Sequence, residues 1–174
     1  MSQTFLDENP PMILDATCSY GKIWPRYATV RIDIRPEVHP DLVMDAKALQ
    51  FPNHYFDEIY CDPPHMFRKT DISLEAIIAH RRRSGRLSAN SFKRYGFWHS
   101  RAEWLDFLDK TNIEFARCLK PNGTLHYKIL DGATKVYEVE VHMDKFEIVK
   151  RIITKTKSNY GHGKVHWLTM RPKP

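Results

Sequence analysis

Short apolar runs recur in the first third of the chain. The runs "MILDA" (12–16), "ATVRID" (28–33), "DLVMD" (41–45) and "FDEIYCD" (56–62) are rich in apolar and β-branched residues, which is typical of buried strands. The connections between them are short, and Pro25 limits any helix in the first connection to about a turn or two. The pattern therefore predicts parallel strands joined by trimmed crossover helices.

The second half of the chain combines a long helical pattern with further strands. Apolar residues follow helical spacing from about Arg101 to Leu119, and "KPNG" follows as a stop signal. "TLHYKIL" (124–130) predicts a fifth strand, and "FEIVKRIITKT" (146–156) with "KVHWLTMR" (164–171) predicts a terminal hairpin. The segment "KVYEVEVHMDK" fits a strand by its alternation and a short helix by its position. A further short helix is expected at 74–83.

These elements predict a single α/β domain over residues 1–174, with a mostly parallel sheet and an antiparallel C-terminal hairpin. The sequence contains no apolar run long enough to span a membrane and no secretory signal pattern near its start. We therefore expect a cytoplasmic protein without a membrane partner. Three cysteines without paired spacing predict buried thiols rather than a disulfide framework, and we expect no metal site.

Positive charge is concentrated in one segment. The net charge is +6, and residues 66–101 hold nine basic and two acidic side chains, so the remainder of the chain has a net charge of −1. This basic insertion interleaves aromatic with cationic residues, which suits phosphate contacts and base stacking on a nucleic acid. The alternative is a solvated basic helix whose aromatic side chains, including Phe97 and Trp98, pack into the core. The expected polynucleotide-binding residues are Arg81, Arg82, Arg83, Lys93 and Arg94.

An aspartate stands at the end of each of the first four predicted strands. These are Asp15, Asp33, Asp45 and Asp62. Carboxyl ends of parallel strands open onto a ligand crevice, and carboxylates accept hydrogen bonds from ribose hydroxyls and amino groups. Any one of the four taken alone is better explained as a loop cap, but all four in register favour a binding site. The sequence lacks both G-x-G-x-x-G and a P-loop motif.

Four segments together resemble the class I, Rossmann-like, S-adenosylmethionine-dependent methyltransferases: "ILDATCSYG", "RIDIR", "VMDAKALQFPNHYFDEIYCDPPH" and "CLKPNGTLHYKI". The combination of DATC, DPPH, LKPNGTL and GKVHWL is similar to small phage and prokaryotic enzymes labelled DNA methylases. The resemblance implies S-adenosyl-L-methionine as the cofactor. The residues implied to line its methionine part are Asp15, Thr17, Cys18, Ser19 and Gly21.

The same resemblance implies that Asp33 binds the ribose hydroxyls, Asp45 the adenine amino group, and the Ala46 backbone an adenine ring nitrogen. Two positions depart from the family pattern. Ser19 stands where the family more usually has glycine, and His65 stands where amino-methylating enzymes of nucleic acids usually carry Tyr, Phe or Trp.

The turn Asp62-Pro63-Pro64-His65 is the expected catalytic segment. An exocyclic amine is a poor nucleophile because its lone pair is delocalised into the ring. A carboxylate and the Pro63 carbonyl can accept its two hydrogens and redirect the lone pair, and the prolines fix φ in the turn. His65 has three expected roles: stacking on the base, accepting a proton, or hydrogen bonding within the loop. Lys128, in the fifth strand, is a further candidate for the acceptor site, although strand lysines often face solvent.

The leading hypothesis is therefore a methyltransferase that modifies an exocyclic amino group on a base of DNA or RNA. Two alternatives remain: a small-molecule or protein methyltransferase on the same fold, and a non-catalytic nucleic-acid-binding relative. The salt dependence of polynucleotide binding separates the first alternative from the leading hypothesis, and binding of S-adenosylmethionine separates the second.

Overall fold

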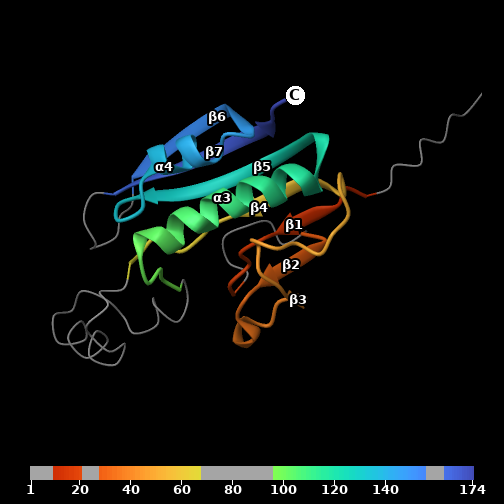
Figure 1. The fold of residues 1–174 in the computed structure, drawn as a ribbon, viewed down its shortest axis with the longest axis horizontal. Helices are drawn as coiled ribbons and strands as arrows, with labels where there is room; N and C mark the ends of the chain where they lie inside the picture. The colour runs from red at the N-terminus through yellow and green to blue at the C-terminus, as the bar shows by residue number, and fades with distance from the viewer. Residues whose placement is uncertain (1–9, 21–27, 68–95, 156–162) are drawn as a thin grey trace, which may run out of the picture.

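The computed structural model describes residues 10–20, 28–67, 96–155 and 163–174. Its centre is a seven-stranded sheet with the order β3-β2-β1-β4-β5-β7-β6 (Figure 1). The first five strands run parallel, while β7 lies antiparallel between β5 and β6. The strands are β1 (Ile13–Asp15), β2 (Val30–Asp33), β3 (Leu42–Val43), β4 (Phe56–Cys61), β5 (Leu119–Asp131), β6 (Phe146–Lys155) and β7 (Lys164–Pro172). The predicted mostly parallel sheet and C-terminal hairpin are confirmed.

The direction of winding changes between β1 and β4. From β1 the chain moves outward to β2 and β3, and it then returns to pair β4 with the other side of β1. Such a reversal leaves a crevice beside the carboxyl ends of the two central strands. The crossover from β2 to β3 contains only a short 3-10 helix, η1 (Pro36–Val38), so the predicted trimming of helices is confirmed there.

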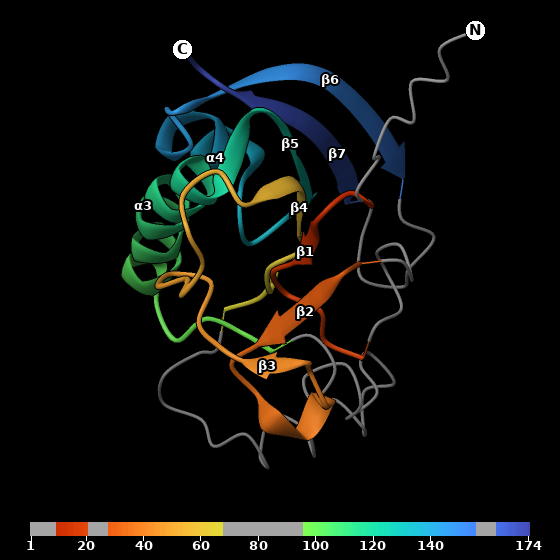
Figure 2. The ribbon, with the colours of Figure 1, turned by 90° about the vertical axis from the view of Figure 1, so that its right-hand side faces the viewer.

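Helix α3 (Arg101–Cys118) matches the predicted 101–119 helix closely. Its N-cap is Ser100, whose hydroxyl accepts a hydrogen bond from the Glu103 backbone N–H at 3.1 Å and so caps the first turn. Its inner face carries Trp104, Leu108 and Phe115, all fully buried. Figure 2 shows α3 and α4 on the same face of the sheet.

The segment that fitted either a helix or a strand forms helix α4 (Val136–His142). Val139 and Met143 are buried while Tyr137 and Val141 are exposed, which is helical rather than alternating spacing. The buried Glu138 carboxylate, on the same helix, accepts hydrogen bonds from the Trp104 indole N–H at 3.0 Å and from the Lys135 backbone N–H at 2.8 Å. The Trp104 contact ties α4 to α3, and the Lys135 contact caps the first turn of α4.

The "KPNG" segment differs from the prediction. Instead of a loop before a strand at 124, β5 begins at Leu119, directly after α3, and its register with β4 shifts between Leu119 and Thr124. Gly123 is needed in this irregular stretch because an added Cβ would lie 2.8 Å from Leu119 Cδ2 and 2.9 Å from the Lys120 carbonyl oxygen. Helix α3 ends before "KPNG", as predicted, but β5 follows it directly without a loop.

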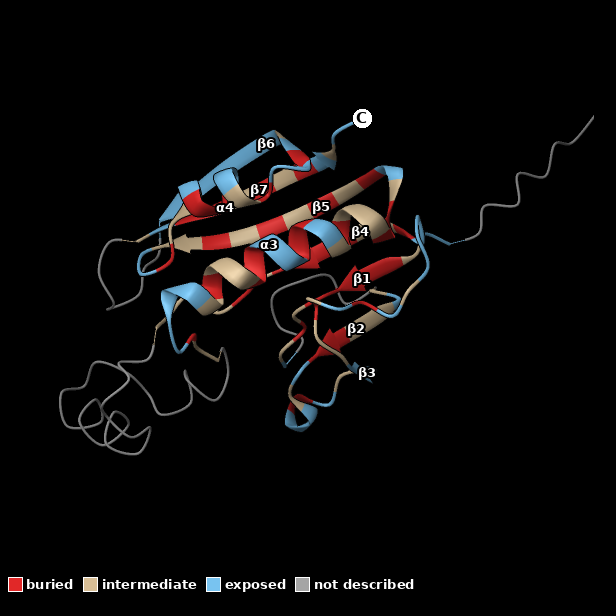
Figure 3. Ribbon diagram, in the orientation of Figure 1, coloured by how far each residue is buried: buried red, intermediate tan, exposed pale blue. Residues whose placement is uncertain are grey.

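Burial follows the centre of the sheet. Figure 3 shows β1, β4 and the inner face of α3 largely buried, while most of the edge strand β6 is exposed. The core includes Leu14, Ile59, Leu125 and Ile129, all fully buried. Within the described segments, no helix has both the length and the apolar character needed to cross a membrane. The predicted helix at 74–83, most of the basic insertion and the hairpin turn at 156–162 lie outside the described residues.

Candidate functional site

The predicted aspartates meet at one edge of the sheet. Asp15 and Asp33 end β1 and β2, Asp62 directly follows β4, and Asp45 lies two residues beyond β3. A cavity of about 480 Å³ opens beside them, a size typical of small-molecule sites. Asp62 and Pro64 of the turn line this cavity. The expected cofactor residues that also line it are Thr17, Cys18, Ser19, Asp33, Asp45 and Ala46.

Asp15 lies behind the cavity rather than in its wall. Its side chain is buried, and Oδ1 accepts a hydrogen bond from the Thr17 backbone N–H at 3.3 Å. Burial raises the pKa of Asp15 to about 7, and repulsion from Asp62 and Asp33 acts in the same direction against the Thr17 hydrogen bond. Through its hydrogen bond with the Thr17 backbone N–H, Asp15 helps to fix the backbone of the loop that follows β1.

Asp33, the predicted ribose-binding residue, is bonded on both oxygens. Arg35 donates from Nε to Oδ1 and from Nη2 to Oδ2, each at 2.9 Å, and the Ser19 backbone N–H donates to Oδ2 at 3.1 Å. Ser19 has φ 47°, a left-handed conformation that glycine adopts more easily. This conformation gives a physical reason for the glycine that is usual at this position in the family that the sequence resembles.

Sequence reasoning missed Arg35. A basic residue two positions after a strand-end aspartate can fold back onto it, and that spacing was the available signal. A ribose that binds Asp33 must share the carboxylate with this guanidinium.

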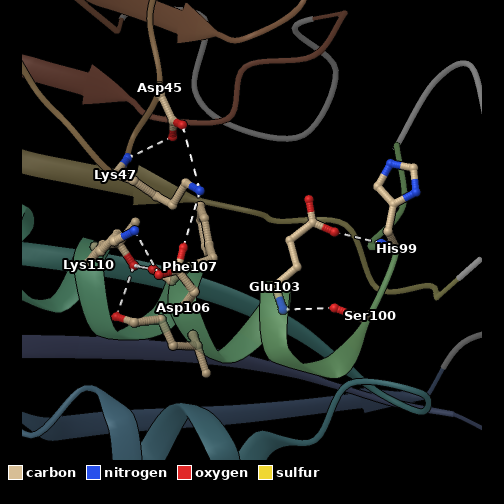
Figure 4. A network of polar contacts seen from close by, with 10 residues as sticks. Asp45, Lys47, His99, Ser100, Glu103, Asp106, Phe107 and Lys110 are labelled. Carbon is tan, nitrogen blue, oxygen red and sulfur yellow. Dashed lines mark hydrogen bonds and ion pairs between the residues drawn. The ribbon is translucent and has the colours of Figure 1, made fainter.

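The part of the cavity beside Asp45 is linked to α3 through Lys47. Asp45 Oδ1 accepts a hydrogen bond from the Lys47 backbone N–H at 2.9 Å, and Lys47 Nζ lies 3.3 Å from Asp106 Oδ2 on α3 (Figure 4). Glu103 and Phe107, one helical turn apart on α3, line the cavity as well. The sequence pattern predicted α3 only as a core helix, so this wall of the cavity was not expected.

Asp62 is held from three separate parts of the chain. Its backbone N–H donates to Thr17 Oγ1 at 2.7 Å, Lys128 Nζ donates to Oδ2 at 2.8 Å, and His65 Nε2 lies 2.9 Å from Oδ1. The last contact has ion-pair distance, although neither of its two atoms makes a hydrogen bond of regular geometry within the described structure. The Asp62 side chain is only 3 % exposed.

Opposing influences set the protonation of Asp62. Burial raises the pKa of this carboxyl, but the neighbouring His65 and the Lys128 ammonium outweigh burial and hold the pKa below its usual value. Asp62 is therefore an ionised acceptor at neutral pH despite its enclosure.

His65 and Lys128 lie outside the cavity wall. The His65 ring contacts Asp62 through Nε2, while Nδ1 accepts a hydrogen bond from the Leu130 backbone N–H at 3.5 Å. This geometry corresponds to the third of the expected roles, a contact within the loop. Lys128 does not face bulk solvent, because its side chain is 14 % exposed and lies against Asp62.

The second half of the turn is fixed by residues 96–98. The Trp98 indole N–H donates to the Pro64 carbonyl at 2.7 Å, and the Trp98 backbone N–H donates to the Met66 carbonyl at 2.8 Å. Gly96 has φ 69°, and a Cβ added there would lie 3.3 Å from Pro64 Cγ. Trp98 is buried in the core, as the alternative interpretation of the basic segment predicted. Phe97, in contrast, lines the cavity.

Several predicted residues fall outside the described residues. These are Gly21, Arg81, Arg82, Arg83, Lys93 and Arg94. In the described segments the three cysteines are free, buried thiols, and no group of His, Cys, Asp and Glu side chains there has an arrangement suited to a metal ion.

Comparisons with known proteins identify the fold. A scan against protein-family models finds no match, and a search of the curated proteins finds none. Among solved structures, the chain is similar to a TehB-like SAM-dependent methyltransferase from Corynebacterium glutamicum, with 15 % identity, a TM-score of 0.51, and coverage of 94 % of this chain and 80 % of that one. It is also similar to TrmN from Thermus thermophilus, with 14 % identity, a TM-score of 0.56, and coverage of 94 % and 44 %.

A third similar structure is the 1,6-didemethyltoxoflavin-N1-methyltransferase of Burkholderia thailandensis, which contains 1,6-didemethyltoxoflavin and S-adenosylhomocysteine. The identity is 10 %, the TM-score 0.55, and coverage is 94 % of this chain and 72 % of that one. At such identities the likeness concerns the fold alone. The chain has the Rossmann-like fold of the S-adenosylmethionine-dependent methyltransferases, as the sequence predicted.

Proposed function

We propose that this protein is an S-adenosylmethionine-dependent methyltransferase that modifies an exocyclic amino group of a base in DNA or RNA. The observation that carries the proposal is the state of Asp62. It is an ionised, nearly enclosed carboxylate on a proline-locked turn, and it faces the same cavity as Asp33 and Asp45.

The donor set of the cavity fits the proposed cofactor. Carboxylates suit the ammonium, sulfonium, ribose hydroxyls and adenine amino group of S-adenosylmethionine, and Ile34 and Met44 add apolar surface for a ring. The residues proposed to hold it are Thr17, Cys18, Ser19, Asp33, Asp45 and Ala46. When bound, the cofactor supplies an electrophilic methyl carbon on a cationic sulfur.

Residues of the turn would prepare the acceptor. Asp62 and the Pro63 carbonyl accept the two amine hydrogens, which directs the nitrogen lone pair toward the methyl carbon. Pro63 and Pro64 fix φ, and the Trp98 indole holds the Pro64 carbonyl. The amine nitrogen must lose one proton in the reaction, and the lowered pKa of Asp62 makes this carboxylate a poor proton acceptor. The proton would therefore leave to solvent.

The nucleic-acid part of the proposal rests on charge and on Phe97. The whole excess of positive charge belongs to residues 66–101, and this segment flanks the turn on its C-terminal side. Phe97 lines the cavity together with Pro64, so an aromatic surface for a base is available although the fourth residue of the turn is His65. A flipped or single-stranded base is the matching acceptor.

The decisive experiment is incubation of the protein with methyl-labelled S-adenosylmethionine and separate pools of DNA, tRNA, rRNA and protein. Digestion and chromatography then identify the labelled nucleoside. Label on an amino-methylated base supports the proposal, whereas label only on protein or on a small molecule contradicts it. Calorimetric titration that detects no binding of S-adenosylmethionine favours a non-catalytic relative.

The basic insertion can be tested separately. Arg82→Ala with Arg83→Ala should weaken polynucleotide binding and reduce the slope of log K against log salt by about one to two, because each phosphate contact releases counterions. An unchanged slope would show that the cluster is only a charged surface.

A further inference from the structure

Lys128 has an unusual place for a strand lysine. Its neighbours along β5, Tyr127 and Ile129, are fully buried in the core, and alternation along the strand turns Lys128 to the other face of the sheet. There its ammonium meets Asp62 Oδ2 at 2.8 Å and lies 5.5 Å from the centre of the Trp167 ring on β7, within the range of a cation–π contact.

The contact depends on the pairing of β4 with β5. Cys61, the last residue of β4, pairs with Tyr127, so the residues that follow each of them, Asp62 and Lys128, lie side by side. Asp62 lines the cavity, but Lys128 and His65 do not. The two nitrogen-bearing side chains therefore contact the carboxylate without occupying the space for a ligand.

We propose that Lys128 is a positioning residue that acts with His65 to keep the Asp62 carboxylate ionised and aimed into the cavity. This role rests on the proposed function of Asp62 as the acceptor of amine hydrogens. A carboxylate must be ionised to accept at both oxygens, since a protonated carboxyl presents one donor instead. Burial favours the protonated form, so the cation behind Asp62 preserves the acceptor.

The other titratable groups that interact with Asp62 do not replace Lys128. Asp15 repels it, while Cys61 and Tyr127, whose pKa values are raised by burial, stay neutral. His65 contributes from within the turn, and its ring is anchored by the Leu130 backbone N–H. Lys128 supplies the permanent charge of the arrangement.

The same two strands provide a matched control. At their opposite ends Lys120 Nζ lies 2.7 Å from Asp57 Oδ1, with side chains 44 % and 35 % exposed. Lys120→Met therefore removes the same kind of ion pair, from the same strand, away from the cavity. Lys128→Arg is the conservative variant, because arginine retains the charge.

The first test needs no activity. The Asp62 carboxyl carbon is followed by ¹³C NMR against pH in the wild type, Lys128→Met, Lys128→Arg and Lys120→Met. Titration should move to higher pH in Lys128→Met and stay close to the wild type in the other two variants. His65→Gln tests the contact between His65 and Asp62 by the same titration. If Lys128→Met fails to fold, this variant decides whether the side chains behind Asp62 keep its carboxylate ionised. An unmoved Asp62 titration in the folded variants overturns the proposal.

The second test uses the pH profile of kcat/KM on the acceptor identified as above. Lys128→Met should lower kcat/KM about 100-fold near neutral pH and move the acid limb to higher pH, so that part of the loss is recovered in alkali. A purely structural lysine would lower the stability and leave the acid limb in place. Transfer to no base by the wild type contradicts the proposed function, whereas an active wild type with an unmoved acid limb contradicts the role of Lys128 alone.

Discussion

Strands β4 and β5 carry an Asp–Lys pair at each end, and the two pairs differ in their surroundings. At the amino end, Asp57 and Lys120 are 35 % and 44 % exposed; at the carboxyl end, Asp62 and Lys128 are 3 % and 14 % exposed. The nitrogen–oxygen distances are 2.7 Å and 2.8 Å. The nitrogen–oxygen distance alone therefore does not distinguish an enclosed pair from a surface pair.

Burial distinguishes the carboxyl-end pair from the amino-end pair. An exposed ion pair is screened by water and contributes at most about 1 kcal/mol, so the ion pair at the amino end adds little to stability. An enclosed carboxylate needs its partner, because without one it tends to take up a proton. The carboxyl-end pair thus controls the chemical state of a residue that lines the cavity, and four predictions test this contrast.

The largest effect is expected at Asp62. Asp62→Asn should lower kcat/KM by about 10²- to 10³-fold, because the amide retains the shape but loses the charge and one of the two accepting oxygens. Binding of S-adenosylmethionine, measured by calorimetry, should change little. Equal loss of binding and transfer would show that Asp62 belongs to the cofactor site instead.

The next effect separates the two ion pairs by stability. Lys128→Met should lower the free energy of unfolding by about 3–5 kcal/mol, since it leaves a buried carboxylate short of a partner. Lys120→Met should lower it by at most about 1 kcal/mol. Urea denaturation at pH 7 measures both, and equal losses would remove the contrast between the two ends of the sheet.

Asp15 should make stability depend on pH. Its pKa is raised from 3.8 to about 7 in the folded protein, so folding loses stability as pH rises between these values, by up to about 4 kcal/mol. Asp15→Asn should therefore have a similar free energy of unfolding to the wild type near pH 4 and a higher one at pH 8.

The control for Asp15 is Asp41, because hydrogen bonds from Arg31 lower its pKa. Asp41→Asn should have the opposite and much smaller effect, a slight loss of stability at pH 8. A gain from Asp15→Asn that is equal at both pH values would contradict a raised pKa.

The smallest effect is expected near the amino end of β5, where close packing around Gly123, and not charge, determines the stability. Gly123→Ala should cost about 1–3 kcal/mol of stability, because the new Cβ would overlap Leu119 and the Lys120 carbonyl. Gly132→Ala is the matched control: its Cβ would meet nothing closer than 3.9 Å, and thermal unfolding should be nearly unchanged. Similar losses at both glycines would point to backbone flexibility instead of close packing.

Much of the fold was predictable because its signals are local. Helical spacing predicted α3, alternation and β-branched residues predicted the strands, and an aspartate at each strand end predicted the edge where the cavity lies. The α4 segment was ambiguous because its apolar residues fit both periods, and contacts of Glu138 with Trp104 and Lys135 decide for the helix. The start of β5 at Leu119 was not predicted, since "KPNG" more often marks a loop.

The sequence by itself determined which chemical groups would stand at the carboxyl ends of the strands, since each aspartate follows its own strand along the chain. Only the tertiary structure decided what those groups contact. Lys128 and Asp62 are 66 residues apart in sequence and meet because β5 pairs with β4. Trp98 reaches Pro64 in the same way, across 34 residues. Such contacts depend on strand register and burial, which no local pattern contains.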